Sequence, residues 1–273
     1  MPYSDYRTDL MGSAKLSPSG PVEAGSWQTF ELVYTAGRFG IDDTGSLKIA
    51  MRFATDFGPV QFDDPAAPGY TTVVASNGAT LDCRWEFKRN IRPWSRALYI
   101  GIQKHFLKEG DTVTIRFGET SGGSKGVRVQ TYCESRFEFK VFVDAIATYD
   151  YVAMTNSPEI AIVPGPPVTW RAVLPTLTKT GDPFRLSIKA EDAWGNPSDK
   201  IDQTLTLRPS GPIAGLPETT PFPRGAFAHV LDDLVAVEAG NYSIDLLDDA
   251  GNVLCQTNTV RIDDAPRLLH FWG

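Results

Sequence analysis

Histidine and cysteine are scarce in this 273-residue sequence, and neither occurs in a pattern that binds a metal or forms a catalytic pair. The three histidines are far apart, without HxH or HExxH spacing, and no G-x-S-x-G motif is present. The three cysteines are odd in number and include no CxxC pair, which excludes a disulfide framework and a cysteine zinc site. These six residues are His105, His229, His270, Cys83, Cys133 and Cys255.

The sequence therefore predicts no catalytic residue, no metal ligand and no cofactor in this chain, and we expect that the chain alone is not an enzyme. Cys83 and Cys133 could pair, but buried free thiols are the favoured interpretation, because free cysteine is so often buried. Acidic pairs such as Asp42-Asp43 could bind calcium or share a proton. Most of these pairs adjoin Gly, Pro or Ala, where Asx turns explain them without a ligand.

Long apolar runs are missing as well. No run approaches the roughly 20 residues that span a bilayer, and residues 1–20 lack the basic start and apolar stretch of a signal peptide. The formal net charge is −7, which disfavours binding to the phosphates of nucleic acid. Together with free thiols, these absences predict a cytoplasmic protein that binds neither nucleic acid nor membrane.

Alternation of apolar and polar residues with a period of two is present throughout the sequence. Each such run predicts a strand with one buried and one solvent-exposed face. Glycine and proline, 24 and 20 residues, separate the runs at short intervals, as is typical of β-sandwiches. We therefore predict an all-β protein. The clearest runs are 47–53, 113–117, 137–143 and 184–190.

A proline-rich segment divides the sequence into two predicted β-sandwich domains in tandem. Pro164-Gly-Pro-Pro167 follows an apolar run, and proline cannot donate to a strand ladder, so this segment is expected to leave the sheet as an extended spacer. The first domain is large for a plain sandwich and needs long loops, and the second has the size of an immunoglobulin-like sandwich. The predicted parts are a first sandwich at 1–163, a linker at 164–167, an immunoglobulin-like sandwich at 168–263 and a connector strand at 264–273.

Two local signals support the immunoglobulin-like interpretation of the second domain. Gly-Asn pairs within 191–197 and 248–252 predict turns, because these residues tolerate a positive φ. Ala239-Gly-Asn-Tyr242 leads into an alternating run, which is the setting of a tyrosine corner. We expect the ring of Tyr242 in the second core and its hydroxyl group on the backbone.

Two features of the first domain could bind a ligand. A glycine-rich loop, Gly118–Arg128, could form a nest of backbone N–H groups for an anion, although a flexible hairpin is the simpler interpretation. Its predicted anion-binding residues are Gly122, Gly123, Ser124, Lys125 and Arg128. Aromatic residues could also line a sugar-binding face, although in a sandwich they more often fill the core. These are Trp27, Trp85, Trp94 and Tyr99.

The last residues are strongly apolar and end without a cap or polar tail. Terminal segments are poorly ordered unless other structure holds them. We therefore predict that the sequence is the front part of a longer protein, with its own downstream domain as partner, and that a homo-oligomer is a further possibility. The predicted interdomain joint consists of Leu268, Leu269, His270, Phe271 and Trp272.

Several motifs together resemble a known family. They are Gly40-Ile-Asp-Asp43, Phe62-Asp-Asp-Pro-Ala66, Arg92-Pro-Trp94, Arg116-Phe-Gly-Glu-Thr-Ser-Gly-Gly-Ser124, Gln130-Thr-Tyr-Cys-Glu134 and Val163-Pro-Gly-Pro-Pro167. They resemble the front half of a bacterial family of uncharacterised multidomain proteins, in which two β-rich domains precede a domain similar to PHP phosphoesterases and metal-dependent amidohydrolases. The resemblance implies that the metal ligands follow a Trp-Gly pair like Trp272-Gly273, so none falls on a residue of this chain.

Three hypotheses of function result. The first is a non-catalytic accessory region that positions or gates a downstream metal-dependent hydrolase domain. The second is a β-sandwich module that binds carbohydrate or a protein surface through aromatic residues and loops of the first domain, and an exposed aromatic row would support it. The third, a self-contained enzyme that uses paired carboxylates, is the weakest, because no nucleophile and base have suitable spacing.

Overall fold

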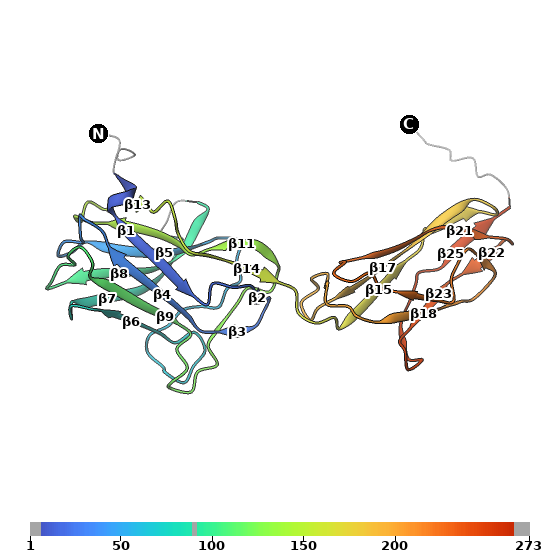
Figure 1. Cartoon of the computed structure of the whole chain (residues 1–273), viewed down its shortest axis with the longest axis horizontal. Helices are drawn as coiled ribbons and strands as arrows, with labels where there is room; N and C mark the ends of the chain where they lie inside the picture. The colour runs from blue at the N-terminus through green and yellow to red at the C-terminus, as the bar shows by residue number, and fades with distance from the viewer. Residues whose placement is uncertain (1–6, 89–91, 265–273) are drawn as a thin grey trace. The chain divides into compact units, whose positions relative to one another are not determined.

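The computed structural model describes residues 7–88 and 92–264, and in these residues the chain is all-β (Figure 1). The described part contains one short 3₁₀ turn, Thr8–Leu10, and no helix that is long and apolar enough to cross a membrane. The fold class predicted from the alternating runs, tandem β-sandwiches of which the second is immunoglobulin-like, is confirmed. The chain forms two compact units, Met1–Val163 and Pro164–Gly273, which divide where the proline-rich segment begins.

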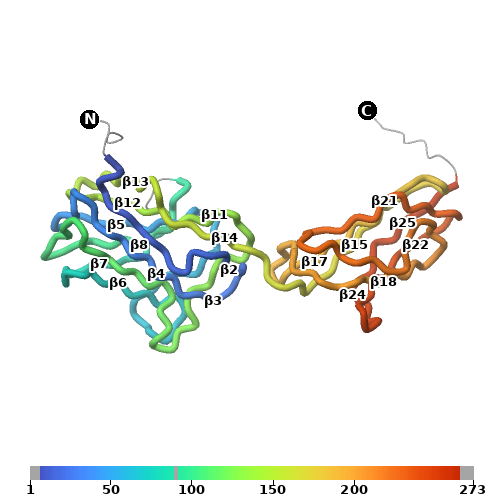
Figure 2. The backbone as a smooth tube through the Cα atoms, viewed as in Figure 1, coloured from blue at the N-terminus to red at the C-terminus, as the bar shows by residue number. Residues whose placement is uncertain are grey.

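The first unit is built on two antiparallel sheets (Figures 1 and 2). One has the order β1-β4-β9-β6, with bounds Gly12–Ser17, Phe30–Ala36, Thr112–Phe117 and Thr71–Ala75. The other has the order β13-β12-β5-β8-β7, with bounds Val152–Ala153, Lys140–Asp144, Ser46–Arg52, Trp94–Gln103 and Thr80–Phe87. Two small sheets complete the unit: β11-β14-β2 at Glu134–Glu138, Glu159–Val163 and Val22–Glu23, and β10-β3 at Val127–Arg128 and Trp27–Gln28.

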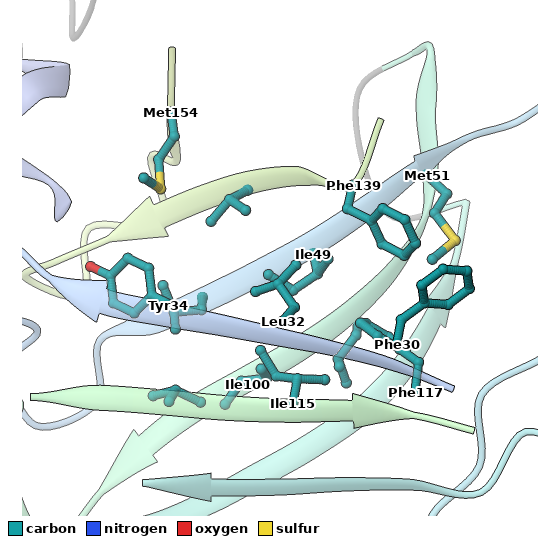
Figure 3. Packing of buried hydrophobic residues seen from close by; sticks show 14 of the residues in the cluster. Phe30, Leu32, Tyr34, Ile49, Met51, Ile100, Ile115, Phe117, Phe139 and Met154 are labelled. Atoms are coloured by element: carbon teal, nitrogen blue, oxygen red, sulfur yellow. The ribbon is translucent and has the colours of Figure 1, made fainter. Parts of the chain in front are cut away.

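The core of the first unit lies between the two larger sheets. Alternate residues of β4 are fully buried, which is the pattern of a strand with one face on the core. Figure 3 shows Phe30, Leu32 and Tyr34 from β4 packed with apolar residues of the facing sheet. The Tyr34 hydroxyl group donates to the carbonyl oxygen of Met11 at 2.5 Å, and burial raises the pKa of Tyr34. The polar end of this large side chain is therefore satisfied inside the core.

The run predicted as one strand over 137–143 is two strands in the structure. β11 pairs with β14, whereas β12 pairs with β5 in the five-stranded sheet, so the chain changes sheets at Phe139. The Phe139 ring is fully buried and packs against the rings of Phe30, Phe117 and Phe137, with centroids 5.4–5.8 Å apart. The apolar alternation continues through the change of sheet because both strands use the same core.

The second unit contains three sheets around a separate core. The first has the order β15-β17-β21-β19, with bounds Thr169–Val173, Pro183–Glu191, His229–Ala236 and Ile213–Ala214. The second has the order β16-β25-β22, with bounds Leu177–Lys179, Val260–Asp263 and Gly240–Tyr242. The third has the order β20-β18-β23-β24, with bounds Thr219–Pro221, Thr204–Pro209, Ile244–Leu247 and Val253–Gln256.

The predicted position of Tyr242 is confirmed. Its side chain is only 8% exposed, and its hydroxyl group donates to the carbonyl oxygen of Glu238 at 3.2 Å. This upstream backbone contact is the defining feature of a tyrosine corner. Gly211 lies directly against the ring, since a Cβ atom there would stand 2.1 Å from Cε1 of Tyr242. The close packing of the ring therefore depends on glycine at that position.

The two predicted Gly-Asn turns have the same hydrogen-bond pattern. In each, an aspartate Oδ1 accepts from the N–H groups two and four residues later, at 2.8–2.9 Å, and the glycine has a positive φ. These aspartates are Asp192 and Asp248. Asp192 and Asn196 of the first turn are buried, whereas Asp248 of the second turn is half-buried and the residues after it are exposed, so the sequence contains a matched pair of turns in different environments.

Asp192 also binds Gly165 of the proline-rich segment. Its Oδ2 accepts from the N–H group of Gly165 at 3.0 Å, and the hydroxyl group of Ser198 donates to the Gly165 carbonyl oxygen at 2.8 Å. The Asp192 residue is 3% exposed. Burial opposes its charge, but hydrogen bonds from Asn196 and from backbone N–H groups outweigh burial and hold the pKa of Asp192 below its ordinary value.

No disulfide bond joins the three cysteines, and the prediction of buried thiols is wrong for Cys133. Cys83 and Cys255 are half-buried, whereas Cys133 is exposed in the loop before β11. Burial, with a smaller contribution from Asp82, raises the pKa of Cys83 to about 11.

We therefore expect a maleimide reagent at neutral pH to label Cys133 before Cys83, since Cys133 is exposed and the thiolate is the reactive form. Mass spectrometry of timed digests measures this order, and faster labelling of Cys83 would contradict it.

Candidate binding face

One row of side chains crosses the solvent-facing surface of the five-stranded sheet in the first unit. Strand register places Phe142 of β12 opposite Lys48 of β5, Lys48 opposite Tyr99 of β8, and Tyr99 opposite Arg84 of β7. Directly opposed residues in antiparallel strands share a face of the sheet. These four residues therefore form a continuous row across four strands, which we call the aromatic row.

The row faces away from the core because its neighbours in each strand face inward. Ile49 follows Lys48 and Leu98 precedes Tyr99, and both of these apolar side chains are fully buried. Side chains alternate between the two faces along a strand. The same period-two pattern that builds the core thus places the aromatic row outside.

Cations stand over aromatic rings along this face. The Arg84 guanidinium carbon is 4.4 Å from the ring centroid of Tyr99, and the Lys48 Nζ is 4.2 Å from that of Tyr151. Near the other end of the strands, the Arg52 guanidinium lies 5.6 Å from the Trp94 ring. Contacts of this kind restrict the rotation of the rings and of the long cationic side chains.

Further contacts fix the centre of the face. Lys48 Nζ lies 3.7 Å from a carboxylate oxygen of Glu86, and these side chains are only 12% and 9% exposed. The Tyr151 hydroxyl group is 2.6 Å from Oγ of Ser46, and burial, ahead of other causes, raises the pKa of Tyr151 to about 12. The hydroxyl group therefore stays protonated at neutral pH and can donate a hydrogen bond.

Small residues make room for the rings on this face. Ala50 and Ala97 lie opposite each other beside the aromatic row and are fully buried, and Gly101 follows two residues after Tyr99. A Cβ atom at Gly101 would stand 2.9 Å from the Tyr99 hydroxyl oxygen, so the ring lies down along the sheet over the glycine. Trp94 reaches Phe142, with ring centroids 6.4 Å apart. The rings of Trp94, Tyr99 and Phe142 are half-buried and leave part of their surface to solvent.

The predicted aromatic residues separate into three environments. Trp94 and Tyr99 lie half-buried on this face, Trp85 is partly buried against the core, and Trp27 is 43% exposed on β3. Sequence reasoning missed Phe142, Lys48 and Arg84. The only signal for them was their position between core residues in alternating runs.

Contacts within the protein hold several residues of the glycine-rich loop. The Glu119 carboxylate accepts from the N–H group of Ser121 at 2.9 Å, and a Cβ atom at Gly122 would contact Pro65. Gly123 and Lys125 are exposed, whereas Ser124 is buried and its hydroxyl oxygen accepts from the N–H group of Gly126 at 3.2 Å. An anion site at the loop therefore stays a prediction.

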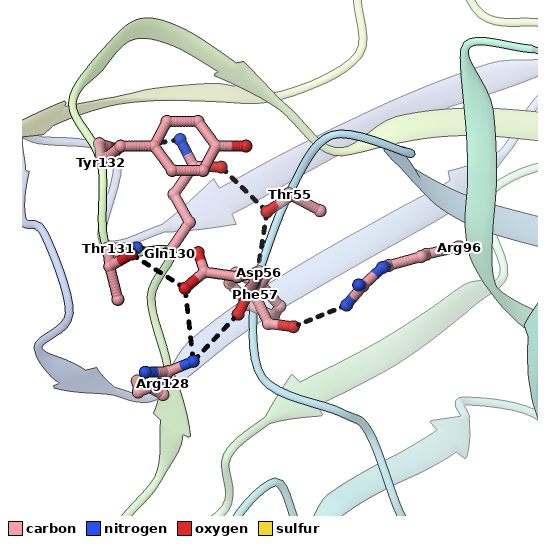
Figure 4. A network of polar contacts seen from close by, with 8 residues as sticks. All are labelled: Thr55, Asp56, Phe57, Arg96, Arg128, Gln130, Thr131 and Tyr132. Carbon is pink, nitrogen blue, oxygen red and sulfur yellow. Dashed lines mark hydrogen bonds and ion pairs between the residues drawn. The ribbon is translucent and has the colours of Figure 1, made fainter.

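Arg128, the fifth residue of the predicted anion site, belongs to a separate polar network (Figure 4). Its guanidinium group lies 3.4 Å from Oδ2 of Asp56. Asp56 also accepts from the N–H and hydroxyl groups of Thr131, at 2.8 and 2.9 Å, and Thr55 donates to the buried side chain of Gln130 at 2.8 Å. The network ties the loop after β5 to the segment after β10, which is a structural role.

The predicted interdomain joint lies outside the described residues. It consists of Leu268, Leu269, His270, Phe271 and Trp272. Within residues 7–88 and 92–264, no group of three or more His, Cys, Asp or Glu side chains could hold a metal ion. His229 is half-buried, with its Nε2 2.8 Å from the Thr220 hydroxyl group, and burial lowers the pKa of His229.

No family model matches the sequence, and no curated protein matches it. Among solved structures, the chain is similar to Yersinia pseudotuberculosis InvD, with a TM-score of 0.38 and 13% identity over 96% of this chain and 59% of that chain. It is also similar to the Escherichia coli adhesin FdeC, with a TM-score of 0.35 and 14% identity over 93% of this chain and 64% of that chain. The collagen adhesin CNA from S. aureus matches at a TM-score of 0.24 and 9% identity, over 93% of each chain. This chain thus spans about three fifths of the InvD and FdeC structures, and the likeness concerns the β-sandwich fold.

Proposed function

We propose that the first unit is a non-catalytic binding module whose ligand is an extended carbohydrate lying across the aromatic row. The observation that carries the proposal is the row itself: Phe142, Lys48, Tyr99 and Arg84 in register on one face of the sheet. The apolar faces of sugar rings stack on aromatic rings, and fixed charged groups supply hydrogen bonds to hydroxyl groups. Because the charged side chains are already held by contacts, little conformational entropy is lost on binding.

The size and shape of the face favour carbohydrate over a protein surface. Four strands spaced ~4.8 Å apart, taken over about five residues each, give a face of ~320 Å². A stable protein interface needs about 800 Å² from each partner. An open face suits a polymer that extends beyond it, since small molecules bind in concave sites.

The accessory hypothesis, in which this chain positions or gates a downstream hydrolase domain, stays a prediction. A carbohydrate-binding module is compatible with it, since such a module could also hold a substrate near another domain. The sequence of the gene beyond residue 273 tests the accessory hypothesis directly. The proposed binding function does not depend on that outcome.

Affinity electrophoresis in gels that contain soluble polysaccharides tests the proposal. A panel of neutral and acidic polymers, such as xylan, mixed-linkage glucan and alginate, is expected to include one that retards the wild-type chain. Tyr99→Ala is expected to weaken that binding about tenfold, or ~1.4 kcal/mol, through loss of one stacking ring. Trp94→Ala is expected to have a similar effect, and migration at increasing polymer concentration gives each Kd.

Trp27→Ala is the matched control, because Trp27 is an exposed aromatic residue on β3 and does not lie on the aromatic row. Its binding is expected to equal that of the wild type. If the Tyr99 and Trp94 variants bind as tightly as the wild type, this face of the five-stranded sheet is rejected as the binding surface. If no polymer retards the chain and a protein ligand is found instead, carbohydrate is rejected as the ligand of this face.

A further inference from the structure

Strand β7 is the longest edge strand in the part of the chain that the structure describes. It contains eight residues, Thr80–Phe87, and ends the order of the five-stranded sheet, so it pairs with β8 on one side only. The other edge of that sheet, β13, has two residues. Long edge strands offer unpaired backbone groups to another strand, and proteins usually shorten, bend or cover them.

The backbone groups that β7 directs away from β8 can be identified from the ladder. The N–H group of Lys88 donates to the carbonyl oxygen of Ser95 at 2.8 Å, and the register from Thr80 to Phe87 has no bulge. Hydrogen-bonded and non-hydrogen-bonded residues alternate in an antiparallel pair. The outward-directed groups therefore belong to alternate residues, namely Leu81, Cys83, Trp85 and Phe87.

Two common protections of an edge, proline and a bulge, are missing from β7, although the strand carries charged side chains. The strand contains no proline, and its pairing with β8 is regular. The loop residues Val60–Asp63 lie beside Arg84–Phe87 but leave an open groove of about 590 Å³ along the strand. Another strand can therefore reach the outward-directed backbone groups.

The charges of β7 point to a second copy of the same strand as the occupant. We propose that two copies of this chain associate through their β7 edges, antiparallel about a two-fold axis at Trp85. In this register Arg84 lies opposite Glu86, and because the axis repeats this pair, the contact contains two such pairs within the strands. Directly opposed residues share a face of the sheet, so these side chains meet. Lys88 follows the end of β7 with a φ of 62°, and its exposed, flexible side chain lies within reach of Asp82 of the other copy.

Neighbouring registers are poorer. An axis at Arg84 would place the two Arg84 side chains opposite each other, and Asp82 opposite Glu86, so every charged pair would repel. An axis at Cys83 would pair Asp82 with Arg84 but leave Glu86 opposite Thr80. Like charges directly opposed destabilise a strand pair. Of these registers, the one about Trp85 therefore brings the most opposite charges together.

The existing contacts of these side chains are compatible with the pairing. Arg84 and Asp82 side chains are 51% and 40% exposed, with Nε of Arg84 3.4 Å from an Asp82 carboxylate oxygen. Glu86 keeps its contact with Lys48 and gains a second cation from the other copy. The contact area is small, so we expect a concentration-dependent dimer with a micromolar Kd.

Sedimentation velocity on the full chain tests the proposal by exchange of charges. Asp82→Lys places two lysines opposite each other, and Lys88→Glu places two acidic groups opposite each other. Each variant alone is expected to be monomeric at concentrations, up to about 200 µM, where the wild type dimerises. An equimolar mixture of the two variants is expected to dimerise again, because each altered residue then faces its opposite charge.

Lys15→Glu is the matched control, since Lys15 is an exposed lysine on β1, an edge strand of the other large sheet. It is expected to dimerise like the wild type, and circular dichroism is expected to show an unchanged fold for every variant. A wild type that stays monomeric overturns the proposal. So does a dimer that survives both β7 variants, or a mixture of folded variants that fails to associate.

Discussion

Asp192→Ala is expected to destabilise the second unit by about 3–5 kcal/mol, because it leaves several buried N–H groups without acceptors. The carboxylate accepts from the N–H groups of Gly165, Trp194 and Asn196, at 2.9–3.0 Å. For a unit of about 100 residues, this loss corresponds to a Tm decrease of more than about 12 °C. Calorimetry gives the Tm, and peptide-resolved hydrogen–deuterium exchange assigns the change to the second unit.

The effect of Asp192→Ala is expected to depend on pH in a definite direction. The pKa of Asp192 is lower in the folded chain than its ordinary value, so the folded state favours the carboxylate. This contribution is fully present above the ordinary carboxyl pKa and is lost as the pH falls through the folded pKa. The difference in Tm between wild type and variant should therefore narrow in acid, and a difference that widens would contradict the assignment.

Asp248→Ala is the matched control for Asp192→Ala. Asp248 accepts from Ala250 and Asn252 in the same turn geometry, but it is half-buried beside exposed residues and holds no residue of the proline-rich segment. Water can satisfy the N–H groups that this substitution frees. A Tm decrease as large as that of Asp192→Ala would show that the turn alone, rather than burial and the Gly165 contact, explains the effect.

Tyr242→Ala is expected to cost about 3–5 kcal/mol, as a large aromatic truncation in a core. Tyr242→Phe removes only the hydrogen bond to Glu238 and is expected to cost about 1 kcal/mol. Gly211 lies against the ring, and because glycine has no side chain, it cannot fill the cavity that alanine would leave. Urea denaturation of both variants measures the two values on one scale.

Phe227→Ala provides the reference for Tyr242→Ala, since Phe227 is an exposed aromatic residue of the same unit. The urea midpoint of Phe227→Ala is expected to lie close to that of the wild type. If Tyr242→Ala shifts the midpoint no more than Phe227→Ala does, the ring contributes nothing as a core residue. If Tyr242→Phe alone accounts for the whole loss, the hydrogen bond rather than the ring is the main contribution.

The sequence was sufficient to predict the fold class, because alternation along a strand depends on neighbours within that strand. The runs that begin near Leu47, Val113 and Phe184 became β5, β9 and β17. The change of sheet at Phe139 could not be predicted in this way. Both β11 and β12 bury alternate residues in the same core, and only their distant partners, β14 and β5, distinguish them.

The candidate binding face was less accessible to prediction, because strand register is not a local property. Trp94 and Tyr99 could be selected by residue type alone, but nothing near Tyr99 in the sequence indicates that Phe142, Lys48 and Arg84 lie beside it. Their alignment depends on three strand pairings between residues up to 94 positions apart in the sequence. A one-residue slip in any pairing would send its side chains to the core.

The parallel pairing of β2 with β14 has a consequence for synthesis on the ribosome. Ile162 pairs with Val22, and the N–H group of Ala24 donates to the carbonyl oxygen of Val163 at 2.9 Å. At about 5–20 residues per second, the roughly 140 residues between these partners take ~7–28 s to be made. During this time β2 has no strand beside it, so the first unit cannot complete this sheet until translation has reached the proline-rich segment. A nascent chain that stalls before Glu159 would present unpaired strands to chaperones and proteases.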